Sequence, residues 1–184
     1  GRAHRALGAN DRAIRDFDQA IKLDPASANA FNNRGLAQSG KGATDRAIED
    51  YDHAISLDPS FAEVYYNRAN TYMDKGDPDR AIQDLDQVIR LSPTFAAAYT
   101  NRGVLYSQKR ALNRAIQDYD QAIQLNPASG NAYNNRGIAY RAMGQEDRAI
   151  QDFDKALQLN PGDALAADNR GNAYRAKGDA DRAI

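Results

Sequence analysis

An asparagine returns every 34 residues along this chain, and its side chain is the one best placed to do chemistry. The five are Asn33, Asn67, Asn101, Asn135 and Asn169. A side-chain amide carries donors and an acceptor together, so it can bond to a peptide backbone whatever the side chains of that peptide are. The recurrence predicts a series of amides that either binds an extended polypeptide or bonds to adjacent helices and fixes their spacing; both roles can hold at once.

Nothing catalytic accompanies these amides. The only two histidines, His4 and His53, are not clustered, and no Ser/His/Asp spacing or phosphate-binding glycine loop is present. The aspartates follow a helical pattern and do not have the spacing of a calcium loop. There is no cysteine, which excludes disulfides and thiolate metal sites. The sequence therefore predicts no enzyme activity, no cofactor and no metal in this segment.

Composition narrows the partners further. The 184 residues carry a formal net charge of −1, so no global charge attracts nucleic acid or anionic lipid. No apolar run approaches the roughly 20 residues that cross a bilayer. We predict that the chain binds neither nucleic acid nor membrane. The compartment stays open between cytoplasm and periplasm, since the chain begins inside a repeat and targeting information is expected to be missing.

The period of 34 residues defines the elements that position the amides. The motif Asp-Arg-Ala-Ile begins at Asp11, Asp45, Asp79, Asp147 and Asp181, with one Asn113 variant, and five prolines keep the same step. Numbering each repeat from 1 to 34 places the proline at position 32. The sequence then predicts one repeat domain, with complete repeats at 28–61, 62–95, 96–129 and 130–163 and partial repeats at 1–27 and 164–184.

Each repeat contains two apolar stripes with helical spacing, which predict antiparallel helices at residues 28–41 and 44–57 and at their equivalents. Glycines are expected to end the first helix of each pair at Gly8, Gly42, Gly76, Gly144 and Gly178. Arg110 takes that position once, which predicts a local irregularity. The candidate N-caps of the first helices are Ser27, Ser60, Thr94, Ser129 and Asp163. Small residues recur at positions 8 and 20, so the two backbones should approach closely.

These positions resemble the tetratricopeptide repeat over the whole chain. Position 4 is aromatic at Phe31, Tyr65, Tyr99 and Tyr133, position 24 is aromatic in all repeats that contain it except at Leu85, and position 32 is proline. The resemblance implies an all-α fold, a right-handed α-solenoid of helix-turn-helix repeats, whose first helices line a concave groove that binds peptide segments of other proteins. One departure is systematic: position 7, usually leucine, is arginine.

In such a groove, positions 2, 5, 6, 9, 12 and 13 of the first helices should face the ligand. Besides the five recurring asparagines, the predicted groove residues are Tyr66, Asn70, Asn134, Arg141, Asn172 and Arg175. Some superhelical members of the family carry a similar asparagine ladder. The lysines of the carboxylate clamp found in chaperone-binding members are missing here, since positions 5 and 2 carry none. A chaperone C-terminal tail is therefore not expected as the ligand.

A buried guanidinium must be paired, so the arginines at position 7 need acidic partners from the preceding repeat. We expect Arg68 to pair with Asp50 or Asp52, and Arg102 with Asp84 or Asp86. Because the resemblance implies leucine at this position, Arg102→Leu should be tolerated, whereas Asp84→Ala should cost more because it leaves a partly buried charge unpaired.

Three functions remain open at this point. The leading prediction is a non-catalytic scaffold that binds an extended peptide of a partner protein. The second is self-assembly, because both terminal repeats are partial and the front and back of two molecules could stack head to tail without closing. The third is a regulatory or substrate-recruiting arm of a larger enzyme.

Overall fold

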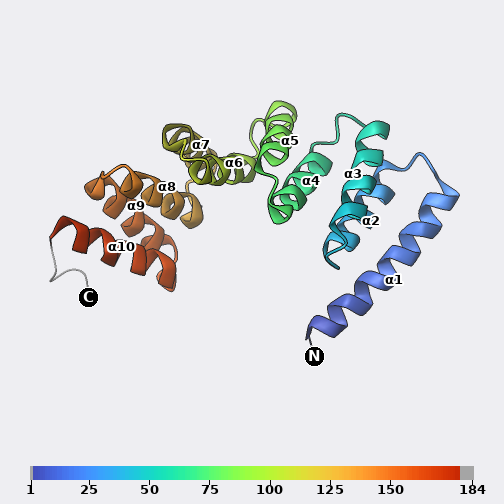
Figure 1. Ribbon diagram of the computed structural model, residues 1–184, viewed down its shortest axis with the longest axis horizontal. Coiled ribbons are helices and arrows are strands. Elements are labelled where there is room, and N and C mark those ends of the chain that lie inside the picture. The colour runs from blue at the N-terminus through green and yellow to red at the C-terminus, as the bar shows by residue number, and fades with distance from the viewer. Residues whose placement is uncertain (1, 179–184) are drawn as a thin grey trace. The chain divides into compact units, whose positions relative to one another are not determined.

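The computed structural model describes residues 2–178, with side chains from residue 9 onward. It contains ten helices in that range and no strand (Figure 1). They are α1 (Arg2–Leu23), α2 (Ala28–Ser39), α3 (Thr44–Leu57), α4 (Ala62–Lys75), α5 (Pro78–Leu91), α6 (Ala96–Gln108), α7 (Leu112–Leu125), α8 (Gly130–Ala142), α9 (Glu146–Leu159) and α10 (Ala164–Lys177). Helix α3 has the bounds predicted for residues 44–57, whereas α2 ends at Ser39, two residues before the predicted end at residue 41.

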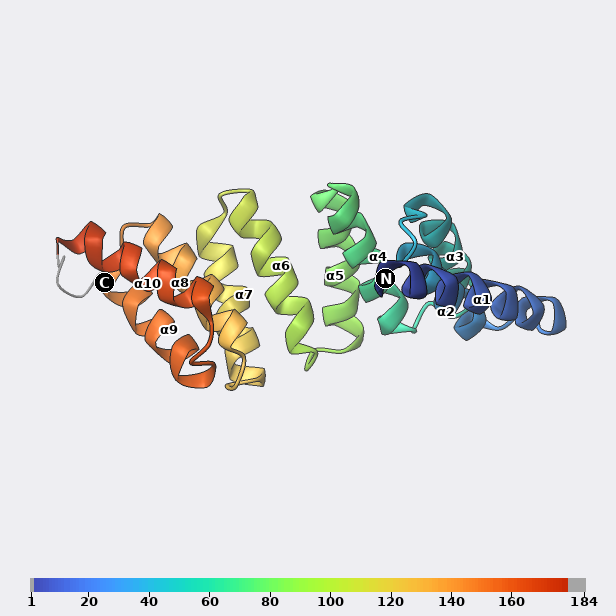
Figure 2. The same cartoon turned by 90° about the horizontal axis from the view of Figure 1, so that it is seen from below.

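The chain divides into two compact units, residues 1–93 and 94–184. The first contains α1 to α5 and the second α6 to α10. Within each unit every helix packs on the next one in sequence, and the two helices of one repeat, such as α6 and α7, lie side by side (Figure 1, Figure 2). The predicted fold class, an all-helical stack of helix-turn-helix repeats, is confirmed.

The predicted helix end at Gly8 is wrong. Helix α1 runs through this residue without a break from Arg2 to Leu23. A glycine inside a helix costs only about 0.5–1 kcal/mol relative to alanine, and the extra turns of backbone hydrogen bonds offset that cost. Glycine at this repeat position therefore permits a helix end and does not impose one.

At the other repeats the left-handed turn forms as expected. Gly76, Gly144 and Gly178 have φ values of 77°, 71° and 82°, and Gly42 has 77° in the turn that follows α2. Arg110 occupies the same position with φ 60° and is the one non-glycine residue with a positive φ in the described chain. The predicted irregularity is thus a strained backbone at an exposed arginine.

Arg110→Gly is expected to raise the free energy of unfolding by about 0.5–1 kcal/mol. The left-handed conformation costs an L-residue roughly 1–2 kcal/mol, and the greater freedom of glycine in the unfolded chain cancels part of the gain. Thermal and urea denaturation measure the difference. Gly144→Ala is the matched control, since nothing lies within 4 Å of an added Cβ there and only the backbone cost remains. It should lose about 1 kcal/mol; equal stability of both variants and the parent would contradict the assignment of strain.

Three of the predicted caps are present. The side chains of Ser27, Ser129 and Asp163 accept from backbone N–H groups in the first turns of α2, α8 and α10. The predicted caps Ser60 and Thr94 are wrong, because they precede the true cap residues by one position. Phe61 and Phe95 stand there and make no side-chain cap bond.

The close approach of the paired helices follows from one contact per repeat. An added Cβ at Gly35 would lie 2.7 Å from Cε1 of Tyr51, and the same contact is 2.6 Å between Gly103 and Tyr119. Gly137 and Phe153 repeat it at 2.6 Å. These rings are fully buried, and burial raises the pKa of Tyr51 and of Tyr119 to about 12. In the remaining complete repeat position 8 is Ala69 and position 24 is Leu85. Alanine is larger than the glycine of the other repeats, and leucine is smaller than their aromatic ring.

Candidate functional site

The arginines at position 7 hold the repeats together. Nε and Nη2 of Arg136 on α8 donate to the two carboxylate oxygens of Asp152 on α9, at 2.8 and 2.7 Å. Its Nη1 donates to Asp120 on α7, in the preceding repeat, at 2.6 Å. Arg68 makes the same contacts to Asp84 and Asp52, and Arg34 to Asp50 and Asp18. Each of these guanidinium groups therefore bonds to the second helix of its own repeat and to that of the repeat before.

These contacts confirm the expected pair between Arg68 and Asp52 and add a partner that was not expected. Arg68 pairs with Asp52 across the junction between repeats, as predicted, but its two-pronged partner is Asp84 and not Asp50. Both oxygens of Asp84, one of the two partners expected for Arg102, accept from Arg68, and Arg102 forms a two-pronged pair with Asp118. The other expected partner of Arg102, Asp86, stays a prediction. Only the acids of the preceding repeat were expected as partners, whereas Arg68 also reaches the carboxylate of Asp84, 16 residues ahead in its own repeat.

The environment of these pairs is largely dry. Asp50, Asp84, Asp118 and Asp152 are 3–5% exposed. The hydrogen bonds that it donates to Asp152 raise the pKa of the Arg136 guanidinium above its ordinary value, although burial acts against them. The guanidinium carbon also lies 5.5 Å from the ring centroid of Tyr133 and 5.8 Å from that of Tyr140, within cation–π range. The arginines fill the place of the usual leucine with a satisfied cation, so we assign them to structure and not to ligand binding.

The predicted groove residues of the first unit lie on α2 and α4. The Asn67 amide donates to Oδ1 of Asn32 at 3.0 Å and ties the two helices together, and Asn32 is 2% exposed. Asn33 points to solvent from α2, while Tyr66 and Asn70 are half-buried on α4. The position-6 amide is therefore at least partly structural here, and Asn67→Ala is expected to lower the melting temperature.

The second unit repeats this arrangement between α8 and α10. The Asn169 amide donates to Oδ1 of Asn134 at 3.1 Å. Arg141 Nη1 lies 3.5 Å from the Asn169 carbonyl oxygen, and Asn172 donates to Asp168 at 3.0 Å. Arg175 is exposed at the end of α10. We call the position-6 asparagines the asparagine ladder, and a bond from one of them to the position-5 amide of the preceding repeat a closed rung.

The remaining predicted residues, Asn101 and Asn135, are half-buried on α6 and α8. A polar hollow of about 220 Å³ opens between these helices. It is lined by Ala96, Ala97, Thr100, Asn101, Asn126, Ser129 and Asn131. All of the polar side chains among them are neutral amides or hydroxyls, which suits recognition of an uncharged polar group.

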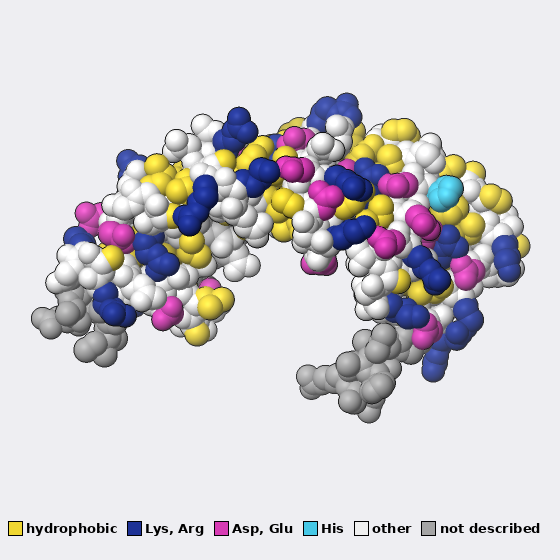
Figure 3. Space-filling model, in the orientation of Figure 1, with side chains coloured by type: hydrophobic (Ala, Val, Ile, Leu, Met, Phe, Trp, Pro, Cys, Tyr) yellow, Lys and Arg dark blue, Asp and Glu magenta, His cyan; other side chains and the backbone are white. Residues whose placement is uncertain are grey.

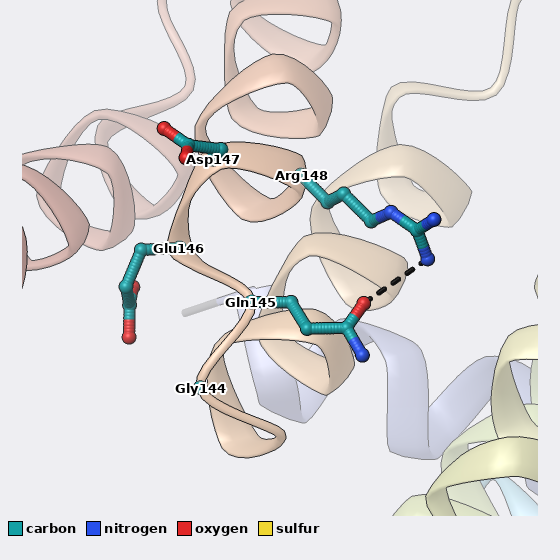
Figure 4. Close-up of a pocket in the computed structure, with 5 residues that line it drawn as sticks. All are labelled: Gly144, Gln145, Glu146, Asp147 and Arg148. Carbon is teal, nitrogen blue, oxygen red and sulfur yellow. Dashed lines mark hydrogen bonds between the residues drawn. The ribbon is translucent and has the colours of Figure 1, made fainter.

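Two other hollows do not form convergent sites. One of about 360 Å³ is lined by five consecutive residues at the start of α9 (Figure 4). There Gln145 Oε1 accepts from Arg148 Nη1 at 3.1 Å, while Glu146 and Asp147 point away from that pair. The other, of about 380 Å³, lies along one face of α3, where the His53 ring stacks on Phe31 at 5.2 Å.

Surface charge is mixed. Basic and acidic side chains are interspersed over the visible face of each unit (Figure 3). Within the described residues no group of histidine and acidic side chains has the arrangement of a metal site. No helix in that part of the chain has the length and apolar character needed to cross a membrane.

Repeated helix pairs, joined by left-handed turns and packed through a small residue against a ring, define a helical-repeat protein. The model of the tetratricopeptide repeat matches residues 62–95, 96–129 and 130–163, and a second model, described as TPR repeat, matches residues 1–42 and 40–76. The chain belongs to the tetratricopeptide repeat family.

Several solved structures resemble the chain. The MamA protein is 33% identical, with 85% of each chain covered and a TM-score of 0.79. YrrB, described as a TPR protein with an unusual peptide-binding site, is 25% identical over 91% of this chain and 87% of its own, with a TM-score of 0.77. A tetratricopeptide repeat protein from Parabacteroides merdae shares the fold at 24% identity and a TM-score of 0.82, with 100% of this chain and 77% of that one covered. No curated protein matches in sequence.

Proposed function

We propose that this chain is a non-catalytic scaffold that binds an extended peptide segment of a partner protein through the ladder-bearing faces of its first helices. The observation that carries the proposal is the repetition of a neutral amide at the same face of α2, α4, α6, α8 and α10. An extended peptide presents N–H and C=O groups at regular intervals, and amides can bond to both. The peptide-binding site ascribed to the similar YrrB supports the same class of ligand.

The hydrogen bonds that these amides already make favour some of them over others as ligand contacts. The side-chain amides of Asn67 and Asn169 already donate one hydrogen bond each in the closed rungs. Asn33 and Asn135 make no side-chain hydrogen bond within the described part of the chain. These two side chains would give a peptide their full bonding capacity without breaking a contact between helices.

The test begins with selection from a library of random unstructured peptides, followed by fluorescence anisotropy on the selected sequences. Asn33→Ala and Asn135→Ala should each weaken binding by about tenfold, the value of one hydrogen bond worth about 1.4 kcal/mol. Neither should change the melting temperature. Asn113→Ala, an exposed asparagine on the second helix α7, is the matched control and should bind as the parent does.

Recognition of the backbone has its own signature. Methylating single backbone nitrogens of a selected peptide should weaken binding, whereas replacing most side chains with alanine should not. If no peptide is selected, or if binding ignores both asparagines and N-methylation, the scaffold proposal falls. Light scattering on the same samples tests self-assembly instead, which would appear as a mass that rises with concentration.

A further inference from the structure

Within the second unit the asparagine ladder has one open rung. Asn32 and Asn134 supply the position-5 oxygen that closes the rungs to Asn67 and Asn169. Between α6 and α8 the equivalent residue is Thr100, whose hydroxyl donates to the Ala96 carbonyl of its own helix at 3.2 Å. Thr100 therefore offers Asn135 no amide, and Asn135 has no side-chain partner in the part of the chain that the structure describes.

The hollow of about 220 Å³ borders this open rung through Thr100, while Asn135 itself is not among its lining residues. Thr100 and Asn101 line it from α6 and Asn131 from α8, one helical turn before Asn135. The shorter threonine and the small Ala96 and Ala97 leave this space. Its volume is several times the roughly 30 Å³ of a water molecule, so it has room for a side chain.

The lining selects the chemistry of the occupant. No charged side chain lines the hollow, so a carboxylate or an ammonium group would lose water without gaining a countercharge. An apolar side chain would offer no partner to the Asn131 amide, which makes no side-chain hydrogen bond in the described part of the chain. A primary amide has the donors and the acceptor that the missing ladder residue would have supplied.

We propose that the hollow at the α6–α8 junction is a subsite for the primary-amide side chain, asparagine or glutamine, of a bound peptide. The inference deepens the proposed peptide-binding function and rests on it for the whole ligand. In the bound state the ligand amide takes the place that Asn32 and Asn134 occupy at the closed rungs. One position of the bound peptide would thus be recognised by its side chain, while the rest of the ladder-bearing face would bind only the peptide backbone.

A small probe tests the subsite without a peptide. N-acetyl-glutamine N-methylamide should shift the side-chain amide resonances of Asn135 and Asn131 in an NMR titration, and the N-methylamides of N-acetyl-leucine and N-acetyl-glutamate, which carry no primary amide, should not. Thr100→Asn, which restores the residue type found at the closed rungs, should fill the hollow and reduce the shifts by at least tenfold. Asn135→Ala should reduce them as well and serves as the second variant if Thr100→Asn perturbs the fold.

Peptide selection supplies the second readout. Peptides selected on the parent should be enriched in Asn or Gln at one position, and those selected on Thr100→Asn should lose that enrichment. Equal shifts with all three probes, or shifts that persist in both variants, would overturn the subsite. If peptides bind without an amide preference, the subsite is wrong and the scaffold stands. If the glutamine probe binds and no peptide does, the scaffold is wrong and the subsite stands alone.

Discussion

Asp152→Ala is expected to lower the free energy of unfolding by about 3–5 kcal/mol, the cost of breaking a buried ion pair. Both oxygens of Asp152 accept from Arg136, and its side chain is 7% exposed. Without it, the guanidinium keeps its charge between two tyrosine rings and loses two of its three bonds. Urea denaturation of the purified variant measures the loss.

Asp120→Ala is the matched control, because Asp120 bonds to the same guanidinium but its side chain is 52% exposed. Water replaces an exposed carboxylate readily, so this variant should lose less than about 1 kcal/mol. If the two alanine variants lose the same free energy, burial does not determine the value of these pairs and our account is wrong.

The same geometry revises the expectation for the arginine. Arg102→Leu alone would leave the buried Asp118 carboxylate without its two-pronged partner, so it should not be tolerated. Replacing the arginine and the aspartate together with apolar residues, as in Arg136→Leu with Asp152→Val, should recover most of the loss, since well-packed apolar pairs can replace buried ion pairs at little cost. A double variant as unstable as Asp152→Ala would contradict this.

Gly103→Ala is expected to destabilise the fold by about 1–3 kcal/mol through overpacking. The added Cβ would lie 2.6 Å from Cε1 and 3.0 Å from Cζ of Tyr119, whose ring is 1% exposed and cannot move into solvent. Helix α6 would then have to shift away from α7. Thermal denaturation detects the loss, which runs against the usual gain from replacing a helical glycine with alanine.

A second replacement should reverse the effect. Gly103→Ala with Tyr119→Leu recreates the natural combination of Ala69 and Leu85, so the double variant should be more stable than the sum of the two single changes predicts. Gly130→Ala is the control, because its nearest atom would be 3.6 Å away, in ordinary contact. If the effects of the two single changes on stability are additive, or if Gly130→Ala is as unstable as Gly103→Ala, the close packing of the Tyr119 ring against Gly103 does not explain the loss.

The helices were predictable from sequence because their signal repeats. An apolar stripe with helical spacing recurs in every repeat, and the bounds that it predicts for residues 44–57 are those of the observed helix α3. The predicted helix end at Gly8 was wrong because glycine is compatible with both a helix end and a helix interior. The arginine partners were only half predictable, since spacing cannot say which of two equidistant carboxylates is the buried one. Thr100 is shorter than the asparagines at the closed rungs, so the open rung could have been predicted from the sequence. The hollow beside it could be found only in the structure.

Arg34, Arg68 and Arg136 each reach one aspartate 16 residues behind and another 16 residues ahead. The sum of these two reaches, with the two-residue step from Asp118 to Asp120, is the length of the repeat. Insertion or removal of a whole repeat brings every guanidinium back to an equivalent pair of carboxylates, whereas a change of any other length leaves buried charges opposed to the wrong neighbours. The buried ion pairs thus leave the number of repeats free to vary during evolution while they hold the length of each one constant.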